Sequence, residues 1–229
     1  MLKDDFLRLG ESAASGLYEE PDRSLFYRKS LGLRRFYENC ELAVYRGESL
    51  YPSGVIAQKM NVVPEYLSGL TFLSKSLNEK APILAEKLKE EFCVYHSTVP
   101  NEHTVAGNMF THSMPNYERI LKEGLLSYIP RIERISDTDM REGLLHVVRG
   151  IELYITRCVT YLKSVSADKM LIASLQRVPL YPAKTAYDAI VAWNFIMYLD
   201  NCDNLGCLGK GILPYYKGEN LIPYLENLY

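Results

Sequence analysis

Apolar residues recur at helical intervals along much of the chain. In the stretch that follows Asp22, the recurring positions are Phe26, Leu33, Phe36, Tyr37, Cys40 and Val44. Spacings of three and four residues place such side chains on one face of a helix, and Gly47 follows the last of them as a C-terminal cap. The pattern therefore predicts a first long helix that ends near Gly47.

The strongest periodic signal lies between residues 139 and 165. Its apolar positions, which alternate by four and three, are Leu144, Val148, Ile151, Ile155, Cys158, Leu162 and Val165. Asp139 is a good N-cap, and Glu142 follows it three residues later, as in a capping box. We predict one long helix with one face buried along its whole length, packed inside a helical domain rather than in a coiled coil.

Prolines divide the rest of the chain into shorter helices. Pro115 opens a helix that we expect to be interrupted or bent at Pro130, and a short helix over 168–177 stops near Pro179. The last long helix runs from about Pro182 to Asp200. Its apolar stretch, 189–199, is shorter than the roughly 20 residues that cross a bilayer, so we predict a buried core helix.

These patterns predict a mainly α fold, α+β at most, and a single domain over residues 1–229. Lys and Arg number 26, Asp and Glu 28, and the net charge is −2. This balance gives no reason to expect nucleic acid or a membrane as partner. The acidic N-terminal residues do not form an export signal, so we expect a cytoplasmic protein.

Two groups of residues are candidates for binding an anion or a metal ion. The cluster of Arg28, Lys29, Arg34 and Arg35 could bind an anion, but a solvated helix face is favoured. The candidate metal ligands are Cys93, His96, His103, His112, Cys202 and Cys207. Their spacing matches no compact zinc signature, so we predict no metal site. The glycines of the 206–211 loop lack the context of a nucleotide-binding loop.

Three segments, in order along the chain, carry a resemblance to a known family. They are AGNMFTHSMPNYERILKEGL (106–125), LQRVPLYPAKTAYDAIVAW (175–193) and GCLGKGILPYY (206–216). Together they resemble the pyruvate formate-lyase-like glycyl radical enzymes, and YRGESLYPSG (45–54) resembles an early segment of the same family. The resemblance implies a helical domain like the N-terminal part of the family's α/β barrel, with Pro214, Tyr215 and Tyr216 packed beneath the site.

The sequence departs from the family pattern at several polar positions. Thr111 and Asn116 replace a glycine and an aspartate, and in the last segment Cys207, Gly209 and Lys210 replace arginine, aspartate and glutamine. The family's catalytic cysteine loop and its radical glycine in Arg-Val-x-Gly-Tyr have no counterpart; Val105-Ala106-Gly107 imitates the latter only superficially. We therefore expect no catalytic residue and no cofactor in this chain, the glycyl radical belonging to full-length family members.

Two functional hypotheses follow. In the first, the chain is an N-terminal portion or truncated relative of a glycyl radical lyase or dehydratase that acts on a small metabolite and is not catalytic alone. The resemblance then makes His112 the substrate-binding residue, although it could equally bond the start of its own helix. In the second, the chain is a non-catalytic module that binds a small molecule or a protein. A protein partner that completes the barrel, or a homo-oligomer, is compatible with both.

Overall fold

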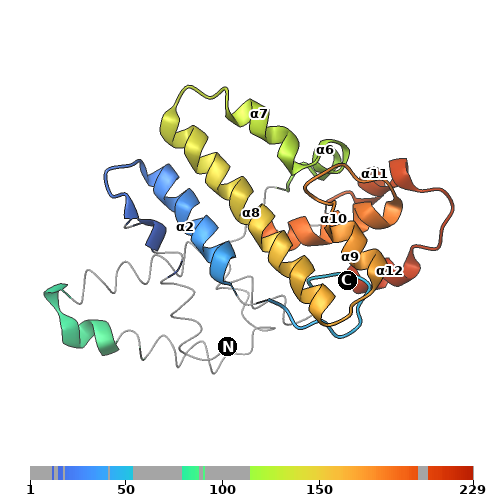
Figure 1. Ribbon diagram of the computed structural model, residues 1–229, viewed down its shortest axis with the longest axis horizontal. Coiled ribbons are helices and arrows are strands. Elements are labelled where there is room, and N and C mark those ends of the chain that lie inside the picture. The colour runs from blue at the N-terminus through green and yellow to red at the C-terminus, as the bar shows by residue number, and fades with distance from the viewer. Residues whose placement is uncertain are drawn as a thin grey trace. The chain divides into compact units, whose positions relative to one another are not determined.

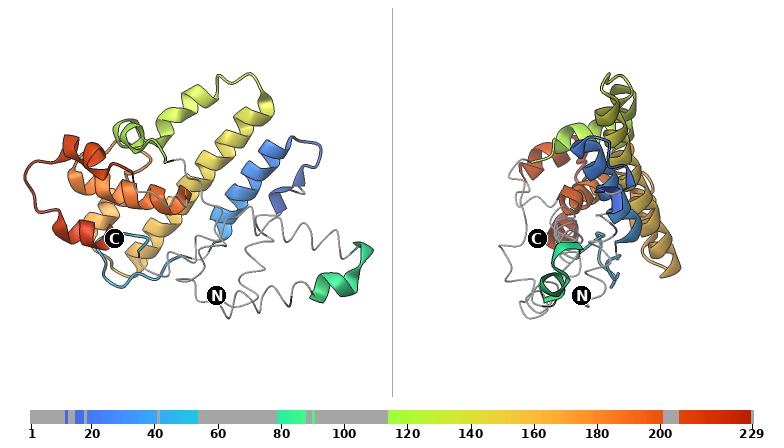
Figure 2. Two further views of the ribbon diagram at one scale, coloured as in Figure 1. Left: turned by 180° about the vertical axis from the view of Figure 1, so that it is seen from behind. Right: turned by 90° about the vertical axis from the view of Figure 1, so that its left-hand side faces the viewer.

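The computed structural model describes residues 12, 15–17, 19–40, 42–53, 79–87, 90, 114–200 and 206–228. In this part of the chain all regular structure is helical and no strand occurs, which confirms the prediction of a mainly α fold (Figures 1 and 2). The elements in chain order are α2 (Leu25–Asn39), α6 (Tyr117–Glu123), η3 (Leu125–Tyr128), α7 (Ile129–Ile132), α8 (Thr138–Ser164), α9 (Lys169–Leu175), α10 (Ala186–Asp200), α11 (Leu208–Ile212), η4 (Leu213–Tyr215) and α12 (Ile222–Leu228).

The chain divides into two compact units. Unit 1 comprises residues 1–40, 62–109 and 136–150, and unit 2 comprises residues 41–61, 110–135 and 151–229. Helix α8 contributes its first half to unit 1 and its second half to unit 2. The expectation of a single domain over 1–229 stays a prediction.

In unit 1, α2 lies along the first half of α8 (Figure 1). Two glycines of α8 allow α2 to approach α8 closely. A Cβ added at Gly143 would lie 2.9 Å from the Phe26 ring, and one added at Gly150 would lie 3.0 Å from Cα of Arg34. Because these glycines present no side chain, side chains of α2 pack directly on the backbone of α8 at Gly143, and the two backbones come close at Gly150.

The beginning of α8 differs from the sequence prediction. The capping carboxylate is that of Asp137, which accepts a hydrogen bond of 2.9 Å from the amide of Met140. Asp139 and Glu142 instead form ion pairs of 2.6 Å with the guanidinium of Arg23. The predicted capping pair was therefore wrong, because both acids are engaged by an arginine from the segment before α2.

In the second half of α8 the predicted buried face is confirmed for Ile155, Cys158 and Leu162, whereas Ile151 is half-buried and Val165, just after the helix, is 43% exposed. There the buried residues are Tyr154, Ile155, Cys158, Val159 and Leu162. In the first half the buried positions are Gly143 and Gly150, whereas Leu144 and Val148 are only half-buried. The face thus follows the glycines that contact α2 rather than the neighbouring aliphatic residues.

Helix α2 ends at Asn39, eight residues before the predicted cap at Gly47. In unit 2 the following segment, 42–53, is not helical, and its backbone forms other hydrogen bonds. The Tyr51 hydroxyl donates to the carbonyl of Ala43, and the Tyr45 amide donates to the hydroxyl of Tyr161. Tertiary contacts of this segment therefore outweigh the helical periodicity of its sequence.

Helix α10 forms the core of unit 2, as predicted. All side chains from residue 186 to residue 196 are buried, and α6, α9, α11, η4 and α12 contact this helix (Figure 2). Among the described helices, none combines the length and the apolar character that crossing a membrane requires.

The break after α6 occurs at Gly124 and not at Pro130. Gly124 adopts φ +75°, and a Cβ there would lie 2.5 Å from the carbonyl oxygen of Leu180. Only glycine combines this backbone conformation with so close an approach. Pro130 instead lies in the first turn of α7, where its missing amide hydrogen costs nothing.

Candidate functional site

The segments that resemble the glycyl radical enzymes meet in unit 2 around Trp193. The side chain of Trp193, on α10, is 2% exposed. The ring of Tyr117, from α6, stacks on it with a centroid separation of 4.1 Å and an angle of 5° between planes. Gly211, from α11, lies so close that a Cβ would be 1.9 Å from Cζ3 of Trp193. We call Tyr117, Trp193 and Gly211 the Trp193 cluster.

Main-chain contacts join the same segments beside the Trp193 cluster. The amides of Leu125 and Leu126 donate to the carbonyls of Pro179 and Leu180, at 2.9 and 3.1 Å, and the amide of Ala183 donates to Leu121 at 2.9 Å. The described parts of 106–125 and 175–193 are therefore held together by backbone as well as by aromatic packing.

A buried carboxylate organises the entry into α10. Asp188 accepts hydrogen bonds from the Ser174 hydroxyl at 2.8 Å and from the amides of Lys184 and Thr185 at 2.9 and 3.1 Å. It also pairs with the guanidinium of Arg177. Burial by itself raises the pKa of Asp188, but the bonds from Arg177, Lys184 and Ser174 outweigh it, so the net pKa is lowered.

Helix α10 also holds the described part of the 45–54 segment. The Tyr187 hydroxyl donates to the carbonyl of Ser49 at 2.7 Å, and the Asn194 side-chain amide donates to the carbonyl of Pro52 at 2.9 Å. Burial raises the pKa of the Tyr187 phenol, which keeps this group a hydrogen-bond donor at neutral pH. All four family-like segments thus contact one another through α10 or beside it.

The candidate site residue His112 lies outside the described residues, and so do Cys93, His96, His103 and Cys202. Of the positions that depart from the family pattern, Cys207 and Lys210 are exposed on or beside α11. Asn116 caps α6, its side chain accepting from the amide of Arg119 at 3.1 Å. Within the described ranges, no three His, Cys, Asp or Glu side chains gather as a metal site would require.

Pro214, Tyr215 and Tyr216 were expected to pack in the core; this expectation was wrong for Pro214 and Tyr216, whereas Tyr215 is half-buried. Gly211 and Ile212 are buried, whereas Pro214 is exposed and Tyr216 is 46% exposed. The reason is geometric, because the contact of Gly211 with Trp193 turns Gly211 and Ile212 inward. The 3-10 turn that follows then directs Leu213 and Pro214 outward.

Asp188 and His146 are in none of the sites that the sequence predicts. Asp188 directly precedes the apolar stretch 189–199, and an acid in this position, eleven residues after Arg177, is a signal for a buried ion pair. His146 lies on α8. Its position between Gly143 and Gly150, at helical spacing, could have placed it on the same face as these glycines.

Comparison with known proteins supports the resemblance at the level of fold. No family model matches the chain, and no curated protein matches it. A solved structure described as 1,2-propanediol dehydration in Roseburia inulinivorans matches with 14% identity and a TM-score of 0.64, over 96% of this chain and 36% of that one. The glycerol-bound B12-independent glycerol dehydratase from Clostridium butyricum matches with 13% identity and a TM-score of 0.66, over 99% and 37%.

The chain therefore resembles glycyl radical enzymes in fold, as the sequence motifs predicted. It spans just over a third of the length of these two structures. At 13–14% identity the likeness concerns the fold alone.

The Trp193 cluster predicts different effects for two glycines of the same short helix. Gly211→Ala should destabilise the protein by about 1–3 kcal/mol, because its Cβ collides with the indole of Trp193. Gly209→Ala is the matched control, since nothing lies within 4 Å of its Cβ, and it should be neutral or slightly stabilising. Urea unfolding followed by fluorescence of Trp193, the single tryptophan, measures both variants. Equal effects would contradict the contact.

Asp188→Asn should destabilise the protein by about 3 kcal/mol, because it leaves Arg177 beside a neutral group in a buried site. The control Glu123→Gln removes the partner of the half-exposed Arg119 and Arg131 and should cost no more than about 1 kcal/mol.

The stability lost in Asp188→Asn should also depend on pH. Since the folded pKa of Asp188 is lowered, its contribution is complete above the unfolded pKa of about 4 and disappears as the pH falls through the folded value. Urea unfolding at a series of pH values should show the wild type and Asp188→Asn converging in acid. A constant difference down to the lowest pH would rule out this assignment.

Proposed function

We propose that the chain forms the helical portion of a glycyl radical lyase or dehydratase that acts on a small polyol or diol. The observation that carries this proposal is the convergence of the family-like segments on α10, with Trp193 at the centre of their contacts. The likeness in fold to two dehydratase structures over nearly the whole chain supports it.

The portion corresponds, in this proposal, to the N-terminal part of the family's barrel. Catalysis requires the cysteine and glycine that carry the radical in the family, and no Arg-Val-x-Gly-Tyr motif occurs in the sequence. The chain alone therefore turns over no substrate and needs further polypeptide, which completes the barrel. The coverage of 36–37% of the dehydratase structures is consistent with this role.

His112 is proposed as the residue that contacts a substrate hydroxyl. It lies two residues before Met114, whose sulfur approaches Gly206 in the last family-like segment. An imidazole can donate to one hydroxyl and accept from another, which suits a diol. The proposal for His112 rests on the sequence resemblance and on the position of the segment that follows it.

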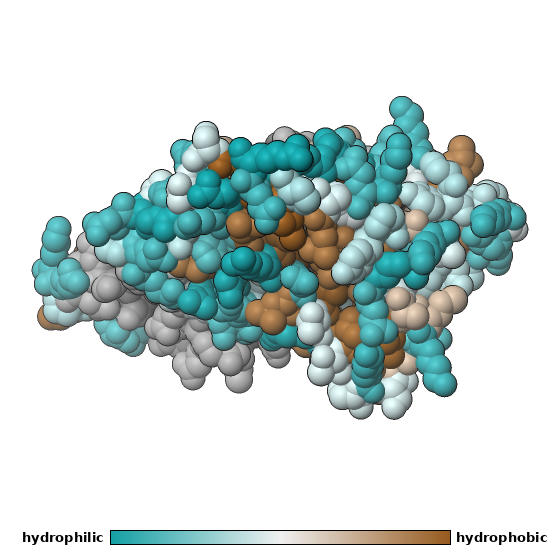
Figure 3. All heavy atoms as spheres, turned by 45° about the horizontal axis from the view of Figure 1, so that its top comes forward, coloured by the Kyte–Doolittle hydropathy of each residue, from teal (hydrophilic) through white to brown (hydrophobic). Residues whose placement is uncertain are grey.

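Exposed apolar side chains favour a protein partner as well. In unit 2, Leu213 is 69% exposed and Ile222 is 62% exposed. Figure 3 shows apolar atoms at the surface between hydrophilic side chains on the face it draws. Such residues would be covered in a completed barrel, or in a non-catalytic interaction module or homo-oligomer, which is the second candidate function.

Calorimetric titration with glycerol and with 1,2-propanediol tests the proposal. We expect the wild-type chain to bind at least one of them and His112→Ala to weaken binding about tenfold, the loss of one hydrogen bond. His96→Ala is the control and should bind like the wild type. Unchanged affinity in His112→Ala would remove the pocket assignment. No binding by a folded wild-type chain would reject a ligand site formed by this chain alone and favour the protein-interaction module.

A further inference from the structure

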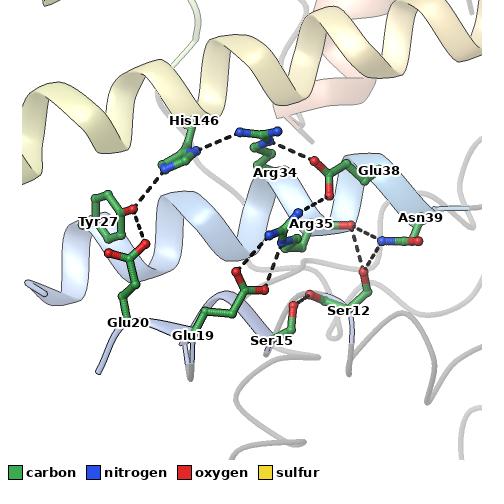
Figure 4. A network of polar contacts seen from close by, with 10 residues as sticks. All are labelled: Ser12, Ser15, Glu19, Glu20, Tyr27, Arg34, Arg35, Glu38, Asn39 and His146. Carbon is green, nitrogen blue, oxygen red and sulfur yellow. Dashed lines mark hydrogen bonds and ion pairs between the residues drawn. The ribbon is translucent and has the colours of Figure 1, made fainter. Parts of the chain in front are cut away.

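His146 joins α8 to α2 within unit 1 through both of its ring nitrogens (Figure 4). Its Nδ1 lies 3.3 Å from a guanidinium nitrogen of Arg34, and its Nε2 lies 3.2 Å from the hydroxyl of Tyr27. Tyr27 in turn donates to the carboxylate of Glu20 at 2.6 Å, and the two rings meet edge to face at a centroid distance of 5.2 Å.

The donors and acceptors in this series of contacts fix one protonation state of the His146 imidazole. A guanidinium has only hydrogens to offer, so Nδ1 must be the acceptor toward Arg34. The single ring proton is then on Nε2 and points to the Tyr27 oxygen. Tyr27 can accept it because its own proton is given to Glu20. A second proton, on Nδ1, would place donor against donor and cation against cation.

The charged groups around His146 come from several elements. From α2 they are Arg34 and Arg35, from its own helix Arg149, and from the segment before α2 Glu19 and Glu20. Glu19 is already paired with Arg35, and Arg34 also pairs with Glu38. Burial, together with Arg34 and Arg149, holds the pKa of His146 below its usual range despite Glu20.

We propose that His146 is an acid-sensitive latch between α2 and the first half of α8. In the neutral form it bonds Arg34 and Tyr27 at once, and protonation of Nδ1 breaks the bond to Arg34. The close packing at Gly143 and Gly150 remains, so acid loosens the side-chain layer of unit 1 rather than separating the helices. The latch is independent of the proposed function.

The direction of the pH effect follows from proton counting. The unfolded chain binds a proton to His146 at a higher pH than the folded chain does, so stability is complete above about pH 6.5 and falls as the pH drops through the folded pKa. At a pH below both pKa values, the unfolding equilibrium constant is about tenfold larger for each unit by which the folded pKa lies below the unfolded pKa.

Titration of the histidine ring protons by NMR in the full chain is the first test. His146 should titrate below 6.5, and Arg34→Gln should raise its midpoint, because a glutamine carbonyl can accept from protonated Nδ1. Arg149→Gln is the control, which removes a nearby charge but no bond to the ring, and its rise should be smaller. The signal is assigned by its loss in His146→Gln, or by elimination in glutamine variants of His96, His103 and His112.

Urea unfolding at pH values of about 7.5 and 5.5 is the second test. The unfolding constant of the wild type should rise more on acidification than that of His146→Gln, whose amide can accept from Arg34 and donate to Tyr27 but does not titrate. A His146 midpoint at or above 6.5, a midpoint that Arg34→Gln does not raise, or equal acid sensitivity in the wild type and His146→Gln would each overturn the proposal.

Discussion

Helix α10 is buried on every side from residue 186 to residue 196, and this constraint shapes unit 2. Burial of an aliphatic or aromatic side chain contributes about 1.5–3 kcal/mol, and every side chain from residue 186 to residue 196 is buried. The helices that contact α10, among them α6, α9, α11 and α12, have five to seven residues each and would not be stable alone. They are stabilised by burying the apolar side chains of α10, and this packing brings Tyr117 and Gly211 to Trp193.

The polar groups of α10 give this packing its specificity. Asp188 and Asn194 are buried, and a buried polar group without hydrogen bonds would cost more than the packing gains. Their partners include backbone groups of Lys184, Thr185 and Pro52, so the buried helix also fixes the course of two loops. The same arrangement explains how a fold can be shared at 13–14% identity, since it needs a buried helix, its caps and a few small residues.

The sequence predicted elements better than it predicted contacts. The helical period gave α8 and the start of α2, and the wholly apolar stretch gave α10. The helical period could not predict the end of α2, because the segment after it forms hydrogen bonds with Tyr161 and Tyr51. It could not predict the cap of α8 either, because Asp139 pairs with Arg23. For the site, family-like segments located Tyr117, Trp193 and Gly211, but their meeting is tertiary. The outward turn at Pro214 and the partners of His146 depend on tertiary packing, although helical spacing alone places His146 on the face of Gly143 and Gly150.

The convergence of three distant segments on Trp193 is the central claim, and proton–proton contacts in NMR test it most directly. The account predicts nuclear Overhauser effects from the Trp193 indole to the ring of Tyr117 and to the α protons of Gly211. An indole that shows neither contact in the folded protein would contradict the account.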